Sequence, residues 1–136
     1  MFFCFFMKVD WQKAPDIQKR LTKLVKDLNL SYIKPGQIVA FRSFGSKARA
    51  YARIWSMPSI WQIALNIKPH YCIEVLSHRF DKMSKDQQTK TLIHELLHIP
   101  KTFSGALLPH SGRGRVKIDM PTVNKYFREY KRNQKL

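Results

Sequence analysis

Apolar residues recur at helical spacing in three stretches of the chain. The first covers residues 15–28 and begins at Pro15, because proline is favoured in the first turn of a helix. The second covers residues 84–99, and the third covers residues 121–130. We therefore predict an N-terminal helix, a helix around residue 90 and a C-terminal helix. A frayed basic tail is expected over residues 131–136.

Shorter apolar runs between the first two helices predict strands. They cover residues 37–42, 48–55, 60–67 and 71–76, with turn sequences between them. The run over residues 48–55 also fits a helix, since its alanine and aromatic positions coincide at helical spacing. The order of these elements predicts an α+β fold, with a mostly antiparallel sheet of three or four strands between the helices.

One face of the strand predicted over residues 48–55 is cationic and aromatic. Arg49, Tyr51, Arg53 and Trp55 alternate there with small or aliphatic residues. Such a face could stack on nucleic-acid bases and bind phosphates. Alternatively, the arginine stems cover the aromatic rings on a solvated sheet face, which is the simpler interpretation.

The length of the chain indicates the number of domains, and the cysteines indicate the redox environment of the protein. A chain of 136 residues fits a single domain whose core needs no disulfide. Cys4 and Cys72 form no disulfide or CxxC pattern, which favours a reduced, cytoplasmic protein. No stretch approaches transmembrane length, so we expect no membrane insertion. Residues 1–7 fit either a short edge strand or an extension before a start at Met7, and the pattern specifies no oligomeric state.

The segment from His94 to His98 reads HELLH, an HExxH motif. Residues four apart on a helix lie on one face, with Cβ atoms about 5–6 Å apart. Both imidazoles can therefore reach one zinc ion at about 2.0–2.1 Å. Glu95 lies one step around the helix, so it can contact a water without being a ligand. This spacing predicts a zinc hydrolase with Glu95 as general base, whereas surface histidines on an ordinary amphipathic helix are the alternative.

A catalytic zinc site usually has three protein ligands and one water. The sequence offers His110, Glu129 and Asp119 as the third ligand. His110 is favoured because Pro100 and Gly105 interrupt the helix and let the chain fold back under it. Glu129 lies among basic residues, where a solvated ion pair is the simpler role, and Asp119 is the third choice.

The formal net charge is +16, from 25 basic and 9 acidic residues. Such a charge attracts polyanions, nucleic acid among them, although adaptation to a particular ionic milieu would also explain it. The residues that we single out as candidate nucleic-acid contacts are Arg49, Arg53, Arg113, Arg115 and Lys117.

Several segments between Tyr71 and His110 together resemble a known family. They are YCIEV at 71–75, FD at 80–81, HELLHIPKTFSG at 94–105 and PH at 109–110. These segments are similar to the metallopeptidases of archaea and phages, which look like compact relatives of the SprT-like zincins. The similarity extends from Trp11 to the last helix, and the long run after the motif is far more specific than HExxH.

This resemblance implies a small zincin-like domain with one zinc ion per chain. It implies His94, His98 and His110 as metal ligands, Glu95 as general base, and a protein or peptide substrate. Two other functions stay open: a basic nucleic-acid-binding protein with a structural or vestigial zinc site, and a protease that acts on DNA-associated proteins.

Three further expectations concern the substrate. Tyr71, Arg113 and Arg115 are candidates for stabilising the oxyanion. In zincin-type proteases an edge strand lies along the cleft and can bind an extended peptide, and the strand over residues 71–76 is nearest to the motif in sequence. Glu74 in that strand could orient a ligand or meet substrate, but a solvated or salt-bridged carboxylate is the simpler role.

Overall fold

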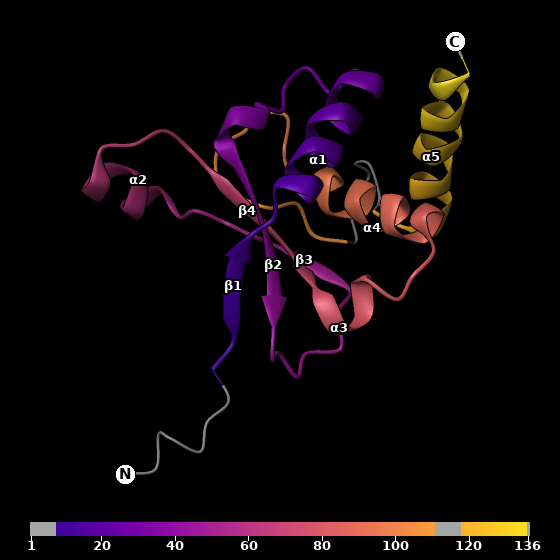
Figure 1. Ribbon diagram of the computed structural model, residues 1–136. Helices are drawn as coiled ribbons and strands as arrows, with labels where there is room; N and C mark the ends of the chain where they lie inside the picture. The colour runs from indigo at the N-terminus through magenta and orange to yellow at the C-terminus, as the bar shows by residue number, and fades with distance from the viewer. Residues whose placement is uncertain (1–7, 111–117, 136) are drawn as a thin grey trace.

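The computed structural model describes residues 8–110 and 118–135 and confirms the α+β class (Figure 1). In chain order the elements are β1 (Asp10–Lys13), α1 (Pro15–Asp27), the 3-10 turn η2 (Pro35–Gln37), β2 (Ile38–Phe44), β3 (Ala52–Trp55), α2 (Ser59–Leu65), β4 (Tyr71–Leu76), α3 (Ser77–Phe80), α4 (Lys85–Leu97) and α5 (Met120–Gln134). None of the described helices is long and apolar enough to cross a membrane.

The four strands form one mixed sheet in the order β1-β2-β4-β3. The β1–β2 and β3–β4 pairs are antiparallel, as expected, but β2 and β4 are parallel. The strand over residues 71–76, which we expected along the cleft, is β4 and lies between two neighbours. The edge strand on that side is β3, so the edge of the sheet is formed by a different segment from the one we expected.

Helices α1 and α4 cover the face of the sheet that carries Ala40 and Ile73 (Figure 1). The guanidinium of Arg20 on α1 donates hydrogen bonds to Gln88 and Thr89 on α4, at 2.8 and 3.0 Å. Helix α5 packs against α4 from the side and also contacts α1. These contacts fix α4 relative to the edge strand β3.

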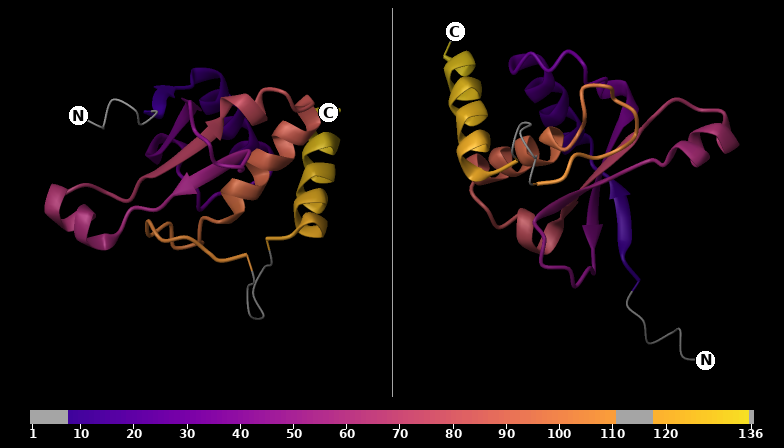
Figure 2. Two further views of the ribbon diagram at one scale, coloured as in Figure 1. Left: turned by 90° about the horizontal axis from the view of Figure 1, so that it is seen from below. Right: turned by 180° about the vertical axis from the view of Figure 1, so that it is seen from behind.

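The prediction of a strand over residues 60–67 is wrong, because Ser59–Leu65 form helix α2. Its β-branched residues and its short length suggested a strand, but Pro58 precedes a helical turn and Asn66 ends it in the left-handed conformation, with φ 52°. The helix extends away from the sheet in every view (Figures 1 and 2). Its apolar residues are therefore exposed and add nothing to the core.

Three smaller differences also concern local structure. Only the second half of residues 48–55 is a strand, and β1 was not expected at all. Helix α5 continues to Gln134, so most of the basic tail is helical and not frayed. Residues 1–7 lie outside the described residues.

Glu74 is a buried structural carboxylate on the sheet face opposite to α4. Its side chain is completely buried, and it accepts hydrogen bonds from Arg53 Nε and Trp55 Nε1, both at 2.9 Å. Burial raises the pKa of Glu74, but the hydrogen bonds, Arg53 first among them, outweigh burial and hold the pKa below its usual value. The ion-pair interpretation is confirmed, although the carboxylate is buried and not solvated.

Candidate metal centre

Helix α4 brings His94 and Glu95 to the site. Ser84 caps the helix, since its hydroxyl accepts the backbone N–H of Gln87 at 3.2 Å. The last helical residue is Leu97, and His98 follows in a helical backbone conformation, with φ −71°. The rings of His94 and His98 consequently lie on the same side, with their centroids 5.1 Å apart.

A loop after α4 returns the chain beneath the helix. Phe103 donates its backbone N–H to the Pro100 carbonyl at 2.9 Å, which closes the first turn of this loop. The backbone N–H of Leu108 then donates to the carbonyl of His98 at 2.7 Å. This second contact places His110, two residues further on, beside the two histidines of α4.

Tyr71 anchors the middle of this loop from the sheet. Its hydroxyl accepts the N–H of Gly105 and donates to the carbonyl of Ala106, both at 2.8 Å. The ring is 1% exposed and packs edge-on against Phe103. Because both hydrogen-bonding directions of the hydroxyl are used, Tyr71 cannot be the oxyanion group that the sequence suggested; the other two candidates, Arg113 and Arg115, lie outside the described residues.

The structure brings His94, His98 and His110 together as one group that could hold a metal ion. Their nearest ring nitrogens all lie within 4.8 Å of one another, and Nε2 of His94 is 3.2 Å from Nε2 of His110. Among the described residues this is the only group of three or more metal-ligating side chains. Glu129 and Asp119 do not belong to it, and Asp119 instead caps α5 by accepting the N–H of Thr122.

The ring of His98 is oriented by a backbone carbonyl. Its Nδ1 lies 2.6 Å from the carbonyl oxygen of Leu108. Because a carbonyl can only accept, Nδ1 carries the hydrogen, and the lone pair of Nε2 is left for a metal. An imidazole whose second nitrogen donates to a carbonyl is the usual arrangement of a histidine ligand.

Burial keeps the histidines of α4 neutral, as metal ligands must be. Burial, together with the neighbouring His98 and His110, lowers the pKa of His94 to about 4. The pKa of His98 is also lowered, again mainly by burial. Both rings are therefore neutral at pH 7, and no proton has to be removed before a cation binds.

Glu95 differs from Glu74 in having no partner. It is 6% exposed and lines the cavity beside the histidines, but no described residue forms a hydrogen bond or an ion pair with its carboxyl group. Burial alone raises its pKa to about 8. A bound cation would oppose this effect and favour the charged carboxylate. The site thus holds one unpaired carboxyl group that can exchange a proton.

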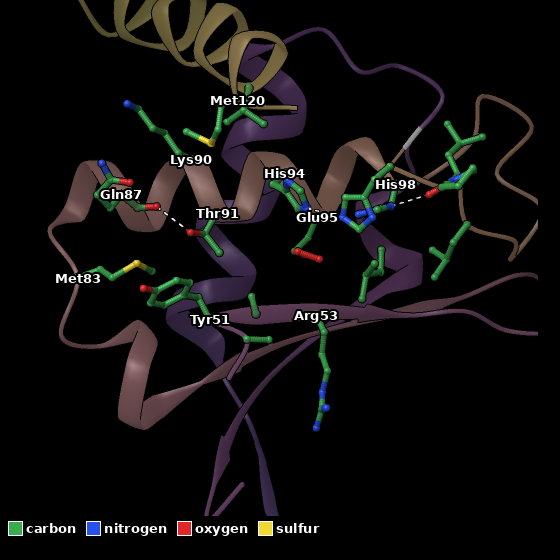
Figure 3. Close-up of a pocket in the computed structure, with 18 residues that line it drawn as sticks. Tyr51, Arg53, Met83, Gln87, Lys90, Thr91, His94, Glu95, His98 and Met120 are labelled. Carbon is green, nitrogen blue, oxygen red and sulfur yellow. Dashed lines mark hydrogen bonds between the residues drawn. The ribbon is translucent and has the colours of Figure 1, made fainter. Parts of the chain in front are cut away.

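The histidines and Glu95 line an open cavity of about 950 Å³ (Figure 3). One wall is α4, and the opposite wall is the chain from Ala50 to Ile54, which includes the edge strand β3. The returning loop closes one end near His98, and Met120 and Val123 contribute from the region of α5. Residues from Gln87 to His98 line the cavity, so it runs along several turns of α4. A closed metal site would need much less space.

Of the candidate nucleic-acid residues, the structure describes Arg49 and Arg53, and these two face different surroundings. Arg49 lines a separate basic cavity. The guanidinium of Arg53 points away from α4 and is paired with Glu74 (Figure 3). Arg113, Arg115 and Lys117 lie outside the described residues.

Three features of the site were not expected from the sequence: the Tyr71 anchor, the Leu108 carbonyl and the edge strand β3. The glycine at 105 was a partial signal, because it marked a break in the chain. A backbone carbonyl carries no side-chain signal, and the position of a strand within a sheet depends on long-range pairing.

Together, the fold and the three histidines define an α+β protein with an HExxH-type candidate metal site. Within that class, the chain belongs to the family described as "putative phage metallopeptidase", whose model matches residues 9–135. This match confirms the resemblance over most of the chain. No curated protein and no solved structure matches the chain.

The first prediction concerns metal content. We expect one metal ion per chain, and we expect its loss in His94→Ala, His98→Ala or His110→Ala, because two imidazoles bind far more weakly than three. Native mass spectrometry measures the occupancy. His78→Ala is the matched control, since His78 is exposed and outside the group. Full occupancy in any variant of the three would contradict the assignment.

The second prediction concerns Gly105, which has φ +94°. A Cβ atom there would overlap the Met57 carbonyl and the Gln62 side chain. Gly105→Ala should therefore destabilise the protein by roughly 1–3 kcal/mol and weaken metal binding through the displaced loop. Gly36→Ala is the control, because no atom lies within 4 Å of a Cβ at Gly36. Equal denaturation midpoints for the two variants would refute this account.

The third prediction concerns pH. Since the pKa of Glu95 is raised from 4.5 to about 8, the folded metal-free protein keeps a proton that the unfolded chain releases. Wild-type stability should therefore fall as pH rises from about 4.5 through about 8, and Glu95→Gln should lack this component. In urea denaturation with a chelator present, the free energy of unfolding of Glu95→Gln should rise relative to that of wild type by at least about 1.4 kcal/mol between pH 5 and pH 8. His94 is present in both proteins, so its contribution to the pH dependence cancels when the two are compared. A constant difference would show that Glu95 titrates normally.

Proposed function

We propose that this protein is a zinc-dependent metallopeptidase. The observation that supports it most strongly is the unpaired, buried Glu95 in the same open cavity as the three converging histidines. The family match over residues 9–135 agrees with peptide-bond hydrolysis and with a protein or peptide substrate.

The donor set favours zinc. Three neutral imidazoles are typical zinc ligands, and two ligands of a tetrahedral zinc ion at about 2.0–2.1 Å lie about 3.3 Å apart. The two Nε2 atoms of His94 and His110 are already 3.2 Å apart. The ring nitrogens of all three histidines lie within 4.8 Å of one another, so a bound ion would need only a local rearrangement of the rings.

A zinc ion held there would polarise the scissile carbonyl and lower the pKa of a water molecule. Glu95 removes a proton from this water while the water oxygen forms a bond to the carbonyl carbon. The same carboxyl group then delivers that proton to the amine nitrogen as the C–N bond breaks. Burial raises the pKa of Glu95 and a bound cation would lower it again, and the balance of these two effects would let the carboxyl group accept a proton and later release it.

The substrate would lie between α4 and the edge strand β3. This strand pairs with β4 on one side only, and the chain from Ala50 to Ile54 lines the cavity opposite to Glu95. An extended peptide could add to the free edge by backbone hydrogen bonds. This arrangement would hold its scissile bond beside the histidines without requiring a particular side chain.

A structural metal site is the main alternative, and the number of ligands argues against it. Structural zinc sites are closed by four protein ligands, and only three side chains converge here among residues 8–110 and 118–135. The segment over residues 111–117 contains only serine, glycine, arginine, valine and lysine, so it offers no usual zinc ligand. The exposed ring of His110 also leaves the site open to solvent.

The fourth prediction tests the role of Glu95. Glu95→Gln should keep one zinc ion per chain but hydrolyse peptides at least about 100-fold more slowly, because the general base is lost. Mass spectrometry gives the zinc content, and cleavage of a denatured protein in zinc-containing buffer gives the rate. Glu74→Gln is the control for losing a buried carboxylate away from the cavity. Loss of zinc or unchanged turnover in Glu95→Gln would show that the role is wrong.

A further inference from the structure

A second cavity, of about 460 Å³, adjoins the metal-site cavity and is lined by basic residues. We call these residues the basic cluster: Lys47, Arg49, His78, Arg79 and Lys82. They come from the loop before β3 and from the α3 region. Tyr51 and Met83 line both cavities, so the two lie next to each other.

The charge of the basic cluster is not neutralised by the rest of the protein. Within the described part of the chain, no cation of the cluster forms an ion pair. The nearest carboxylate in sequence is Asp81, and it is already bound by Arg42 and by the hydroxyl of Ser77. The cluster is therefore a site of unpaired positive charge at the end of a cleft.

The distance from the metal centre is set by α4. Met83 and Tyr51 lie near the start of this helix, and His98 lies at its end (Figure 3). Since a helix rises about 1.5 Å per residue, His94 lies roughly 10 Å along the axis from Gln87, which lines the cleft near its basic end. An extended peptide covers about 3.3 Å per residue, so this distance corresponds to about three substrate residues, and the basic cluster begins beyond Gln87.

We propose that the basic cluster selects peptide substrates that carry Asp or Glu roughly three to five residues from the scissile bond, on one side of it. The inference rests on the proposed peptidase function. A peptide that lies along β3 and leaves the cleft past Tyr51 and Met83 enters the cluster directly. Acidic side chains there gain charge-assisted hydrogen bonds, whereas basic ones are repelled.

The aromatic contacts favour a peptide over single-stranded nucleic acid as the partner. Binding of single strands relies on aromatic rings on which bases stack. The ring of Tyr51 already has the guanidinium of Arg79 over it, 4.7 Å from its centroid. Trp55, the next aromatic residue along the strand, has Arg53 over one face at 5.2 Å and lies with Glu74 on the sheet face away from the cleft. Side-chain carboxylates need no such stacking surface.

The test uses two pools of 12-residue peptides with randomised central positions. One pool carries three Glu residues at each end, and the other carries three Gln residues there. Zinc-loaded protein should cleave the Glu pool with a higher kcat/KM, by about tenfold at low salt. Mass spectrometry of the products should place the required acidic residues on one side of the cleaved bond only.

Substitutions then locate the effect. Arg49→Gln/Lys82→Gln should reduce the preference for the Glu pool by about fivefold or more and leave the Gln pool unchanged, as expected for two exposed charge pairs. Lys19→Gln/Lys26→Gln removes the same charge from α1, away from the cleft, and should change neither pool. Equal rates on the two pools, or equal losses in both double variants, would overturn the inference.

Two further results distinguish a failure of this inference from a failure of the proposed peptidase function. If neither pool nor a denatured protein is cleaved, the proposed function fails. The preference for acidic peptides can then still be tested by binding alone, from the fluorescence anisotropy of the labelled pools mixed with zinc-loaded Glu95→Gln. A preference for the Glu pool that depends on Arg49 and Lys82 would still support it. If a 12-nucleotide single strand binds those residues more tightly than the Glu pool does, the cluster is a nucleic-acid site and the inference is wrong.

Discussion

The two hydrogen bonds between His98 and Leu108 are the interaction on which the site depends. The Leu108 N–H binds the carbonyl of His98, and the His98 ring donates to the carbonyl of Leu108. One pair of residues thereby fixes the path of the loop and the tautomer of a ligand. Without it, the nearest preceding anchor of His110 would be the Tyr71 contact with Ala106, and the entropy of ordering the chain between them would oppose metal binding.

The sheet supports this arrangement from the other side. Tyr71 is the first residue of an interior strand and is fully surrounded by the core, so its hydroxyl is a rigid point of attachment. It satisfies two backbone groups of the returning loop, and the N–H of Gly105 is buried. Leaving a buried group of this kind unsatisfied costs about 1–3 kcal/mol. The core of the sheet and the metal centre are therefore coupled through one side chain.

The two buried glutamates show how environment assigns different roles to one residue type. Glu74 is surrounded by donors, so its charge is stabilised and its pKa is lowered. Glu95 is buried without donors, and its pKa is raised to about 8. The first arrangement holds two strands together, and the second leaves a proton-exchanging group beside the histidines. Sequence position next to His94 marked only the second one.

The sequence predicted those parts of the molecule that depend on local periodicity. Helices α1, α4 and α5, strand β4 and the grouping of His110 with the α4 histidines all follow from spacing, capping and chain breaks. The failures involve information from elsewhere in the fold. The residues of α2 were predicted as a strand because an apolar run usually packs into a sheet, but these residues are exposed and form a helix. Strand β3 lies at the edge because β2 pairs in parallel with β4.

The tautomer of His98 was not predictable for a similar reason. It is set by a backbone carbonyl ten residues away, and a carbonyl is present at every position of every chain. The cluster of cations beside the cleft was likewise visible only as excess charge. Its significance comes from α3 and the loop before β3 meeting around one cavity.

X-ray absorption spectroscopy of the zinc-loaded protein tests the central claim most directly, because it reports the ligands of the ion itself. The account predicts four nitrogen or oxygen neighbours at about 2.0–2.1 Å, with the multiple-scattering signal of three imidazoles and one light atom from solvent. A sulfur neighbour at about 2.3 Å, or a signal for four protein ligands, would contradict an open three-histidine site.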